Sequence, residues 1–227
     1  MDTLDSIAQC YRSEKHSVDW SDKWMWISIA SIIFNPTFWN IVARREYKAK
    51  FITRIFGGNS LYGCYALAAT IFILGLIRDG LFKVAIDLQP RAECMSALPL
   101  QVVGVLLFAV GNVFVLSSMY VLGVTGTYLG DYFGILMDSR VTSFPFNVND
   151  NPMYNGSVMV FLGTALWERS PAGVYLSCVV LFVYRIALKF EGPFTSMIYQ
   201  KRDEARAKDA ISNQPAAKKT RKATKVL

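Results

Sequence analysis

The sequence has few of the side chains on which soluble enzymes rely for covalent or metal-dependent catalysis. Its single histidine, His16, lies in a polar N-terminal stretch, which argues against a histidine-based catalytic triad. The four cysteines, Cys10, Cys64, Cys94 and Cys178, are scattered singly, and two of them fall in apolar stretches. We therefore predict neither a disulfide framework nor a metal site, and we interpret the cysteines as small buried hydrophobic residues.

Charged residues are also scarce, and they are absent from three long stretches. Only 18% of the 227 residues are charged, whereas 53% are hydrophobic. No Asp, Glu, Lys or Arg occurs between Lys23 and Arg44, between Arg54 and Arg78, or between Glu93 and Asp131. About 20 apolar residues are enough to cross the hydrocarbon core of a bilayer. The pattern therefore predicts an all-α integral membrane protein.

Five stretches are apolar enough to be membrane helices. We predict them at residues 24–42, 60–77, 98–122, 152–167 and 171–190. Asn151-Pro152 and Ser170-Pro171 each place a capping residue before a proline, which is typical of a helix start. The last two helices then form a hairpin, which returns Glu191 to the membrane face that holds Asn151. Asn35-Pro36 interrupts the first stretch, so a re-entrant segment is the alternative there.

The composition divides the chain into three regions. Residues 1–23 are polar and have no basic region followed by an apolar run, so we expect no cleavable signal peptide. Residues 24–200 form the membrane domain. Residues 201–227 form a basic tail without apolar periodicity, which we expect to be disordered and to contact anionic lipid headgroups, not nucleic acid.

The distribution of basic residues predicts the orientation of the helices. Lysines and arginines crowd residues 44–54 and the tail, and such segments are typically cytoplasmic. The loop over residues 78–97 is then lumenal, and the loop over residues 123–151 is cytoplasmic together with the C-terminus.

The cytoplasmic loop is rich in glycine and polar groups. The cluster comprises residues 123–134, 140–146 and 150–156, and it shares its membrane face with Glu191. Glycines let a backbone approach either a ligand or another helix, so helix packing is the alternative interpretation for any one of them. The gathering of the whole cluster on one face favours a ligand site.

The same residues resemble a known family. The string from Gly126 through Tyr154, with Glu191-Gly192-Pro193-Phe194-Thr195 and Ile198-Tyr199, is similar to the phospholipid methyltransferase family. The resemblance covers residues 98–199, the motif-bearing part of the membrane domain. It implies packed transmembrane helices, S-adenosylmethionine as methyl donor, and stepwise N-methylation of phosphatidylethanolamine derivatives, the monomethyl and dimethyl forms in a fungus, to phosphatidylcholine. It also implies the endoplasmic reticulum, with a mitochondrial membrane as the alternative.

The resemblance also implies donor-binding residues. The family's Gly-x-Gly element corresponds here to Ala109-Val110-Gly111, and its Glu-Glu element corresponds to Glu191-Gly192, so each keeps half of the family pattern. An acid at the end of a span can accept hydrogen bonds from ribose hydroxyls or from the donor's amino group.

The remaining candidate residues follow from the chemistry of methyl transfer. Aromatic faces suit a sulfonium or a methylated ammonium, which favours Tyr154 at the donor and Tyr132 at the substrate, with membrane-interface anchoring as the alternative. Arg140 is the candidate partner of the lipid phosphate, and the alternative is that its side chain snorkels to the membrane interface. Asn151 is a further candidate substrate contact. Substrate amines must lose a proton, and the candidate acceptors are Asp131, Asp150 and Glu191.

Two other classes of protein remain open. A small transporter would also have several spans, but transporters commonly carry ionisable residues near the membrane midplane and have repeated halves. The first three predicted spans contain no charge, and the sequence shows no repeat. A membrane assembly factor without catalysis is excluded only by the motifs.

Overall fold

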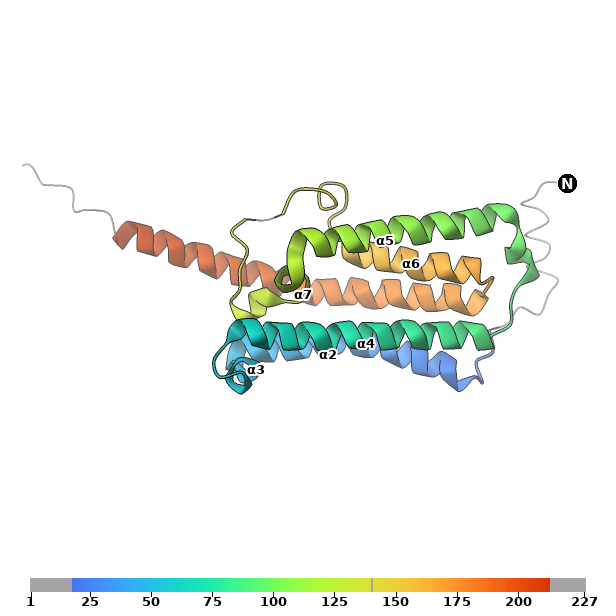
Figure 1. Ribbon diagram of the computed structural model, residues 1–227, viewed down its shortest axis with the longest axis horizontal. Helices are drawn as coiled ribbons and strands as arrows, with labels where there is room; N and C mark the ends of the chain where they lie inside the picture. The colour runs from blue at the N-terminus through green and yellow to red at the C-terminus, as the bar shows by residue number, and fades with distance from the viewer. Residues whose placement is uncertain (1–17, 140, 213–227) are drawn as a thin grey trace, which may run out of the picture.

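The chain folds into long helices that run side by side along one axis (Figure 1). The structure is a computed structural model and describes residues 18–139 and 141–212. The long helices are α2 (Lys23–Ala49), α4 (Ser60–Leu88), α5 (Leu98–Thr127), α6 (Pro152–Trp167) and α7 (Pro171–Ser212). Short helices α3 (Phe51–Ile55), η1 (Glu93–Ser96) and η2 (Gly130–Phe133) connect them. No strand occurs within the described ranges, and the predicted all-α class is confirmed.

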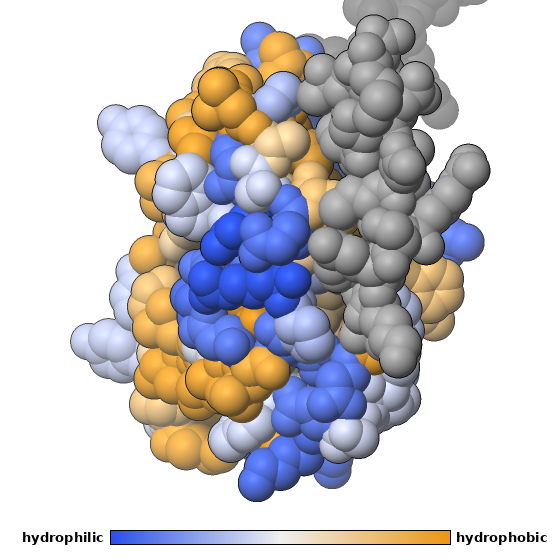
Figure 2. Space-filling view, turned by 90° about the vertical axis from the view of Figure 1, so that its right-hand side faces the viewer, coloured by the Kyte–Doolittle hydropathy of each residue, from blue (hydrophilic) through white to orange (hydrophobic). Residues whose placement is uncertain are grey.

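Four of the helices are long and apolar enough to cross a membrane. They are α2, α4, α5 together with η2, and α7. Helix α6 has the bounds that the sequence predicts, but its 16 residues extend over only about 24 Å. Large apolar side chains are exposed along the bundle, among them Phe34, Phe72 and Phe182. Figure 2 shows the end of the bundle at the turn between α6 and α7, where polar side chains gather with apolar ones beside them. The chain is an integral membrane protein.

Helices α2, α4 and α7 extend well beyond their predicted ends. Helix α4 reaches Leu88, so the loop predicted over residues 78–97 is wrong in its first half. The prediction of a disordered tail from residue 201 is wrong as far as Ser212, because α7 continues that far. Residues 201–210 are mostly good helix formers, and a helix that is already nucleated extends into them at little cost. Residues 213–227 lie outside the described residues.

Helix α2 is continuous through Pro36, so the predicted interruption is wrong. Proline removes one backbone donor, and nearby polar side chains hold the chain around it. Thr37 Oγ1 donates to the Ile33 carbonyl over 2.8 Å, and Asn40 Nδ2 donates to the Pro36 carbonyl over 3.0 Å. Asn35 Nδ2 donates across to the Leu74 carbonyl of α4 over 3.0 Å. Asn35, one of the two residues that suggested a break, therefore joins α2 to α4.

Helices α5 and α6 pack with their backbones almost in contact. A Cβ atom added to Gly163 would lie 2.6 Å from the Gly104 carbonyl oxygen, and one added to Gly111 would lie 2.6 Å from the Gly156 carbonyl oxygen. The two glycines of each helix are seven residues apart, and the pairs have the order expected of antiparallel neighbours. Small residues allow this close approach between membrane helices. The two glycine pairs therefore set the register of α6 against α5.

The glycine pairs generate a stability prediction. Gly163→Ala should lower the free energy of unfolding by about 1–3 kcal/mol, because the added methyl group must displace backbone atoms. Gly80→Ala is the matched control, since a Cβ atom there meets nothing within 4 Å and alanine favours a helix. Thermal unfolding of the detergent-solubilised variants checks both, and an unchanged melting temperature for Gly163→Ala would contradict the tight packing.

Candidate active site

A cavity of about 800 Å³ lies where α5 gives way to η2. Its walls come from the ends of α5 and α6, from residues 184–203 of α7 and from the segment over residues 135–151, and Trp39 of α2 and Ile71 of α4 complete it. The volume is in the range of small-molecule sites. In Figure 1 this end of the bundle also carries α3 and the outgoing part of α7.

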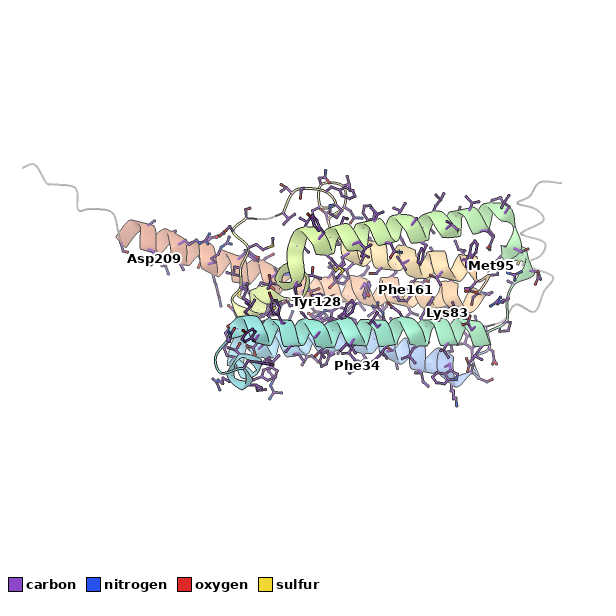
Figure 3. The ribbon with its side chains drawn as sticks, viewed as in Figure 1. Phe34, Lys83, Met95, Tyr128, Phe161 and Asp209 are labelled. Atoms are coloured by element: carbon purple, nitrogen blue, oxygen red, sulfur yellow. The ribbon has the colours of Figure 1, made fainter. Side chains whose placement is uncertain are left out.

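Glycines turn the chain across this end of the bundle. Gly123 has φ 64° and breaks α5, and Gly134 has φ 83° after η2. Only glycine adopts such angles without strain. The bend at the end of α5 is visible in Figure 3, where Tyr128 is labelled just beyond it. The loop glycines thus place η2 and its Asp131 against the cavity instead of letting α5 continue outward.

The hairpin of α6 and α7 brings Tyr154 and Glu191 together, as the sequence predicts. The Tyr154 hydroxyl donates a hydrogen bond to Glu191 Oε2, and both residues line the cavity. The Tyr154 ring also packs edge-on against the Tyr184 ring, with 5.0 Å between the ring centroids. The two residues are 37 positions apart in sequence, so only the hairpin can join them.

The other predicted proton acceptors line the same cavity. Asp131 Oδ2 accepts a hydrogen bond of 2.9 Å from the Thr195 hydroxyl, which ties η2 to α7. Asp150 and Asn151 lie on the rim at the start of α6. The cavity therefore combines three carboxylates with aromatic side chains, an arrangement that suits a ligand carrying positive charge.

Helix α7 is braced where Pro193 interrupts its hydrogen bonding. Arg44 of α2 donates from Nη2 to the Phe190 carbonyl oxygen over 2.6 Å, and its guanidinium carbon lies 4.8 Å from the centroid of the Phe194 ring. Glu191 lies between these contacts. Since Arg44 binds the backbone on one side of Glu191 and the ring on the other, α2 holds the acid in place from behind the cavity.

The outgoing part of α7 forms another wall. Arg202 donates to the Met137 carbonyl oxygen over 2.5 Å, and the Tyr199 hydroxyl accepts from the Met137 backbone amide over 3.3 Å. Tyr199 and Arg202 both line the cavity. Met137 is therefore held against the site by Tyr199 and by Arg202, and Arg202 belongs to the segment that was predicted to be a disordered tail.

Several predicted site residues lie outside the cavity lining. Tyr132 is fully buried and stacks on the Phe194 ring with 5.0 Å between centroids. Gly111 faces α6, whereas Ala109, Val110 and Gly192 are exposed. Arg140 lies outside the described residues. The structure thus explains the glycine at position 111 by helix packing, and its donor contact stays a prediction.

Other residues of the cavity were not predicted from the sequence. Tyr184 is seven residues before Glu191, which is about two helical turns, so this spacing could have placed both on one face. Trp39 and Ile71 also line the cavity, but they stand within apolar runs of the first two membrane helices. Nothing in their local pattern distinguishes them from residues that face lipid.

The part of the chain that holds this cavity is similar to known proteins. A family model described as phospholipid methyltransferase matches residues 100–202, which include most of the cavity lining. The phosphatidyl-N-methylethanolamine N-methyltransferase of Neurospora crassa is 57% identical over 85% of this chain and 90% of its own. The Saccharomyces cerevisiae protein of the same name is 52% identical over 89% of this chain and 98% of its own.

More distant relatives extend to animals. The phosphatidylethanolamine N-methyltransferase of Rattus norvegicus is 48% identical over 77% of this chain and 87% of its own. No solved structure matches the chain. The extent and identity of these similarities, together with the carboxylates and aromatic residues gathered in one cavity, lead to one conclusion: the chain belongs to the phospholipid methyltransferase family.

Proposed function

We propose that this protein transfers methyl groups from S-adenosylmethionine to the amines of monomethyl and dimethyl phosphatidylethanolamine, and so produces phosphatidylcholine. The observation that carries the proposal is the hydrogen-bonded pair of Tyr154 and Glu191 in a cavity that also contains Asp131 and Asp150. The fungal relatives that share more than half of the aligned residues are named for methylation of phosphatidyl-N-methylethanolamine. The later methylation steps therefore fit best.

The cavity fits the proposed donor in size and chemistry. S-adenosylmethionine supplies a methyl group on a positively charged sulfur. Glu191 would accept hydrogen bonds from its amino or ribose hydroxyl groups, and Tyr154 would orient Glu191. Tyr128 and Tyr184 line the cavity as well and offer aromatic faces to a cation. The implied donor contacts of Gly111 and Gly192 rest on the family resemblance alone.

The side chains have little covalent work in such a reaction. The amine lone pair forms a bond to the methyl carbon as the carbon–sulfur bond breaks, so the protein contributes alignment and exclusion of water. A protonated amine cannot attack, and Asp131, Asp150 and Glu191 are the candidate acceptors of its proton. Asp131 is held by Thr195, which fixes the direction in which its second oxygen can act. Arg140 would bind the lipid phosphate, with Asn151 near the headgroup.

The site would face the cytoplasm. The basic residues from Arg44 to Arg54 and those of the outgoing part of α7 lie at the end of the bundle that contains the cavity (Figure 1). Clusters of lysine and arginine are characteristic of the cytoplasmic side. We place the protein in the endoplasmic reticulum, with its basic C-terminal residues near anionic lipid headgroups. A transporter or an assembly factor would not account for the match to the methyltransferases.

The proposed substrate preference can be tested directly. Purified protein in detergent–lipid micelles should move label from S-adenosylmethionine into monomethyl and dimethyl phosphatidylethanolamine, and more slowly into phosphatidylethanolamine itself. Chromatography of the labelled headgroups measures each product. Folded protein that labels none of the three lipids would refute the proposal.

The proposed donor pocket predicts coupling between its two central residues. Tyr154→Phe and Glu191→Gln should each weaken donor binding by about 1–3 kcal/mol, since the first removes the hydrogen bond to the carboxylate and the second removes the charge of the acceptor. The double variant should depart from additivity by more than about 0.5 kcal/mol, because both residues contact one ligand and each other. Calorimetric titration measures the affinities, and Glu204→Gln, an exposed acid further along α7, is the control. Additive effects in folded variants would show that Tyr154 is not part of the donor-binding site.

The proposed orientation predicts which sites are accessible from the cytoplasm. In a chain without its native cysteines, cysteine substituted for Arg45, Asp138 or Arg206 should react with an impermeant thiol reagent on sealed microsomes. Cysteine substituted for Arg91 should react only after permeabilisation, because Arg91 lies at the opposite end of the bundle near the α6–α7 turn. Protection of Asp138→Cys on sealed vesicles would reverse the orientation.

A further inference from the structure

Arg78 is the first charged residue of α4 and lies where the apolar stretch of that helix ends. It is followed by ten more residues of α4, about 15 Å of helix, before the helix ends at Leu88. The exposed large residues that precede it on α4 are apolar, namely Phe72, Ile73, Leu76 and Ile77, whereas the exposed Asp79, Lys83 and Asp87 follow it. A charge in hydrocarbon is costly, and where one is kept it commonly serves a function.

The guanidinium group of Arg78 joins three helices. Its side chain is only 12% exposed, and Nη1 donates a hydrogen bond to the Tyr184 hydroxyl of α7. Nε and Nη2 donate to Asp79 Oδ1 over 3.0 and 2.8 Å. The guanidinium carbon also lies 5.0 Å from the centroid of the Phe161 ring on α6, a residue labelled midway along the bundle in Figure 3. Asp79 balances the charge of Arg78, and the Tyr184 hydroxyl oxygen accepts the hydrogen bond from Nη1.

Tyr184 connects this charge to the proposed donor site. Tyr184 is 5% exposed, lines the cavity, and packs its ring against that of Tyr154. Tyr154 in turn donates to Glu191. An arginine can only donate, so the Tyr184 oxygen must be the acceptor in its contact with Arg78. The hydroxyl of Tyr184 is thereby fixed in direction, and its ring forms a fixed surface for Tyr154.

Stability alone does not explain an arginine in this position. The Asp79 side chain is 53% exposed, and an ion pair with an exposed partner contributes little to stability, so a helix contact here needs no charge. To hold the Tyr184 hydroxyl in one direction requires a hydrogen-bond donor of fixed orientation. The planar guanidinium of arginine provides such a donor.

We propose that Arg78 is a positioning residue for methyl transfer: it orients Tyr184, and through the Tyr184 ring it holds the Tyr154–Glu191 pair in its binding geometry. The inference rests on the proposed function, because it assumes that this pair binds the methyl donor. It assigns Arg78 no contact with either substrate.

The test compares four single variants and one double variant. Tyr184→Phe and Arg78→Met should each weaken binding of S-adenosylmethionine roughly three- to tenfold, the range expected for one lost hydrogen bond. The double variant should bind about as weakly as either single variant, a departure from additivity of more than about twofold. Arg78→Lys should recover part of the affinity, since lysine still donates but without the planar fork. Arg185→Met is the matched control, because Arg185 follows Tyr184 but is exposed and does not line the cavity.

Melting temperature and the yield of folded protein are followed for every variant. Normal donor binding by folded Arg78→Met and Tyr184→Phe, while Glu191→Gln loses it, would overturn the role of Arg78 and leave the proposed function standing. Normal binding by Glu191→Gln and Tyr154→Phe, with no methylated lipid formed by the wild-type chain, would instead overturn the proposed function. If Arg78→Met does not fold, Tyr184→Phe decides alone, because it removes a single oxygen atom, and unchanged donor binding by that variant rejects the inference.

Discussion

The backbone contact between α5 and α6 is the constraint on which the site depends. Helix α6 is short, and its height in the bundle is set by the two pairs of glycines that interlock it with α5. That height places Tyr154, in the first turn of α6, in the wall of the cavity. The α6–α7 turn then carries the same register into α7. A larger side chain in the interface would move Tyr154 relative to both η2 and Glu191.

A second constraint comes from placing polar groups beside apolar helices. Buried polar groups are costly unless they are paired, and here each partner comes from a different helix. Glu191 accepts a hydrogen bond from Tyr154 of α6, and Asp131 accepts one from Thr195 of α7. Arg44 of α2 donates a hydrogen bond to the Phe190 carbonyl oxygen. The polar contacts of the site therefore form only when the bundle is assembled. Binding geometry and helix packing are determined together.

Helix α7 contributes to the bundle, to the cavity and to the segment beyond it. Its first half packs in the bundle, its middle holds Glu191, and its outgoing part holds residues 135–139 through Arg202. Figure 1 shows the helix changing direction as it leaves the bundle, and proline is a common cause of such a bend. The bend turns one continuous element into two walls of a cavity. A reaction that needs alignment more than covalent help is well served by walls of this kind.

Patterns in the sequence were enough to predict the class of the protein, the cores of its membrane helices and the family. Uninterrupted apolar stretches and proline-capped helix starts are local signals, and they located α6 to the residue. They also predicted that Tyr154 and Glu191 lie on one membrane face, because the second helix of a hairpin returns the chain to the face where the first began. The folded structure was needed to show which helices continue past their apolar stretches, that Gly111 packs against α6, and that Tyr184, Trp39 and Ile71 line the cavity. Those outcomes depend on which face of each helix packs against which neighbour. A helix that is apolar on every face has no amphipathic pattern, so its packing face cannot be predicted from its sequence.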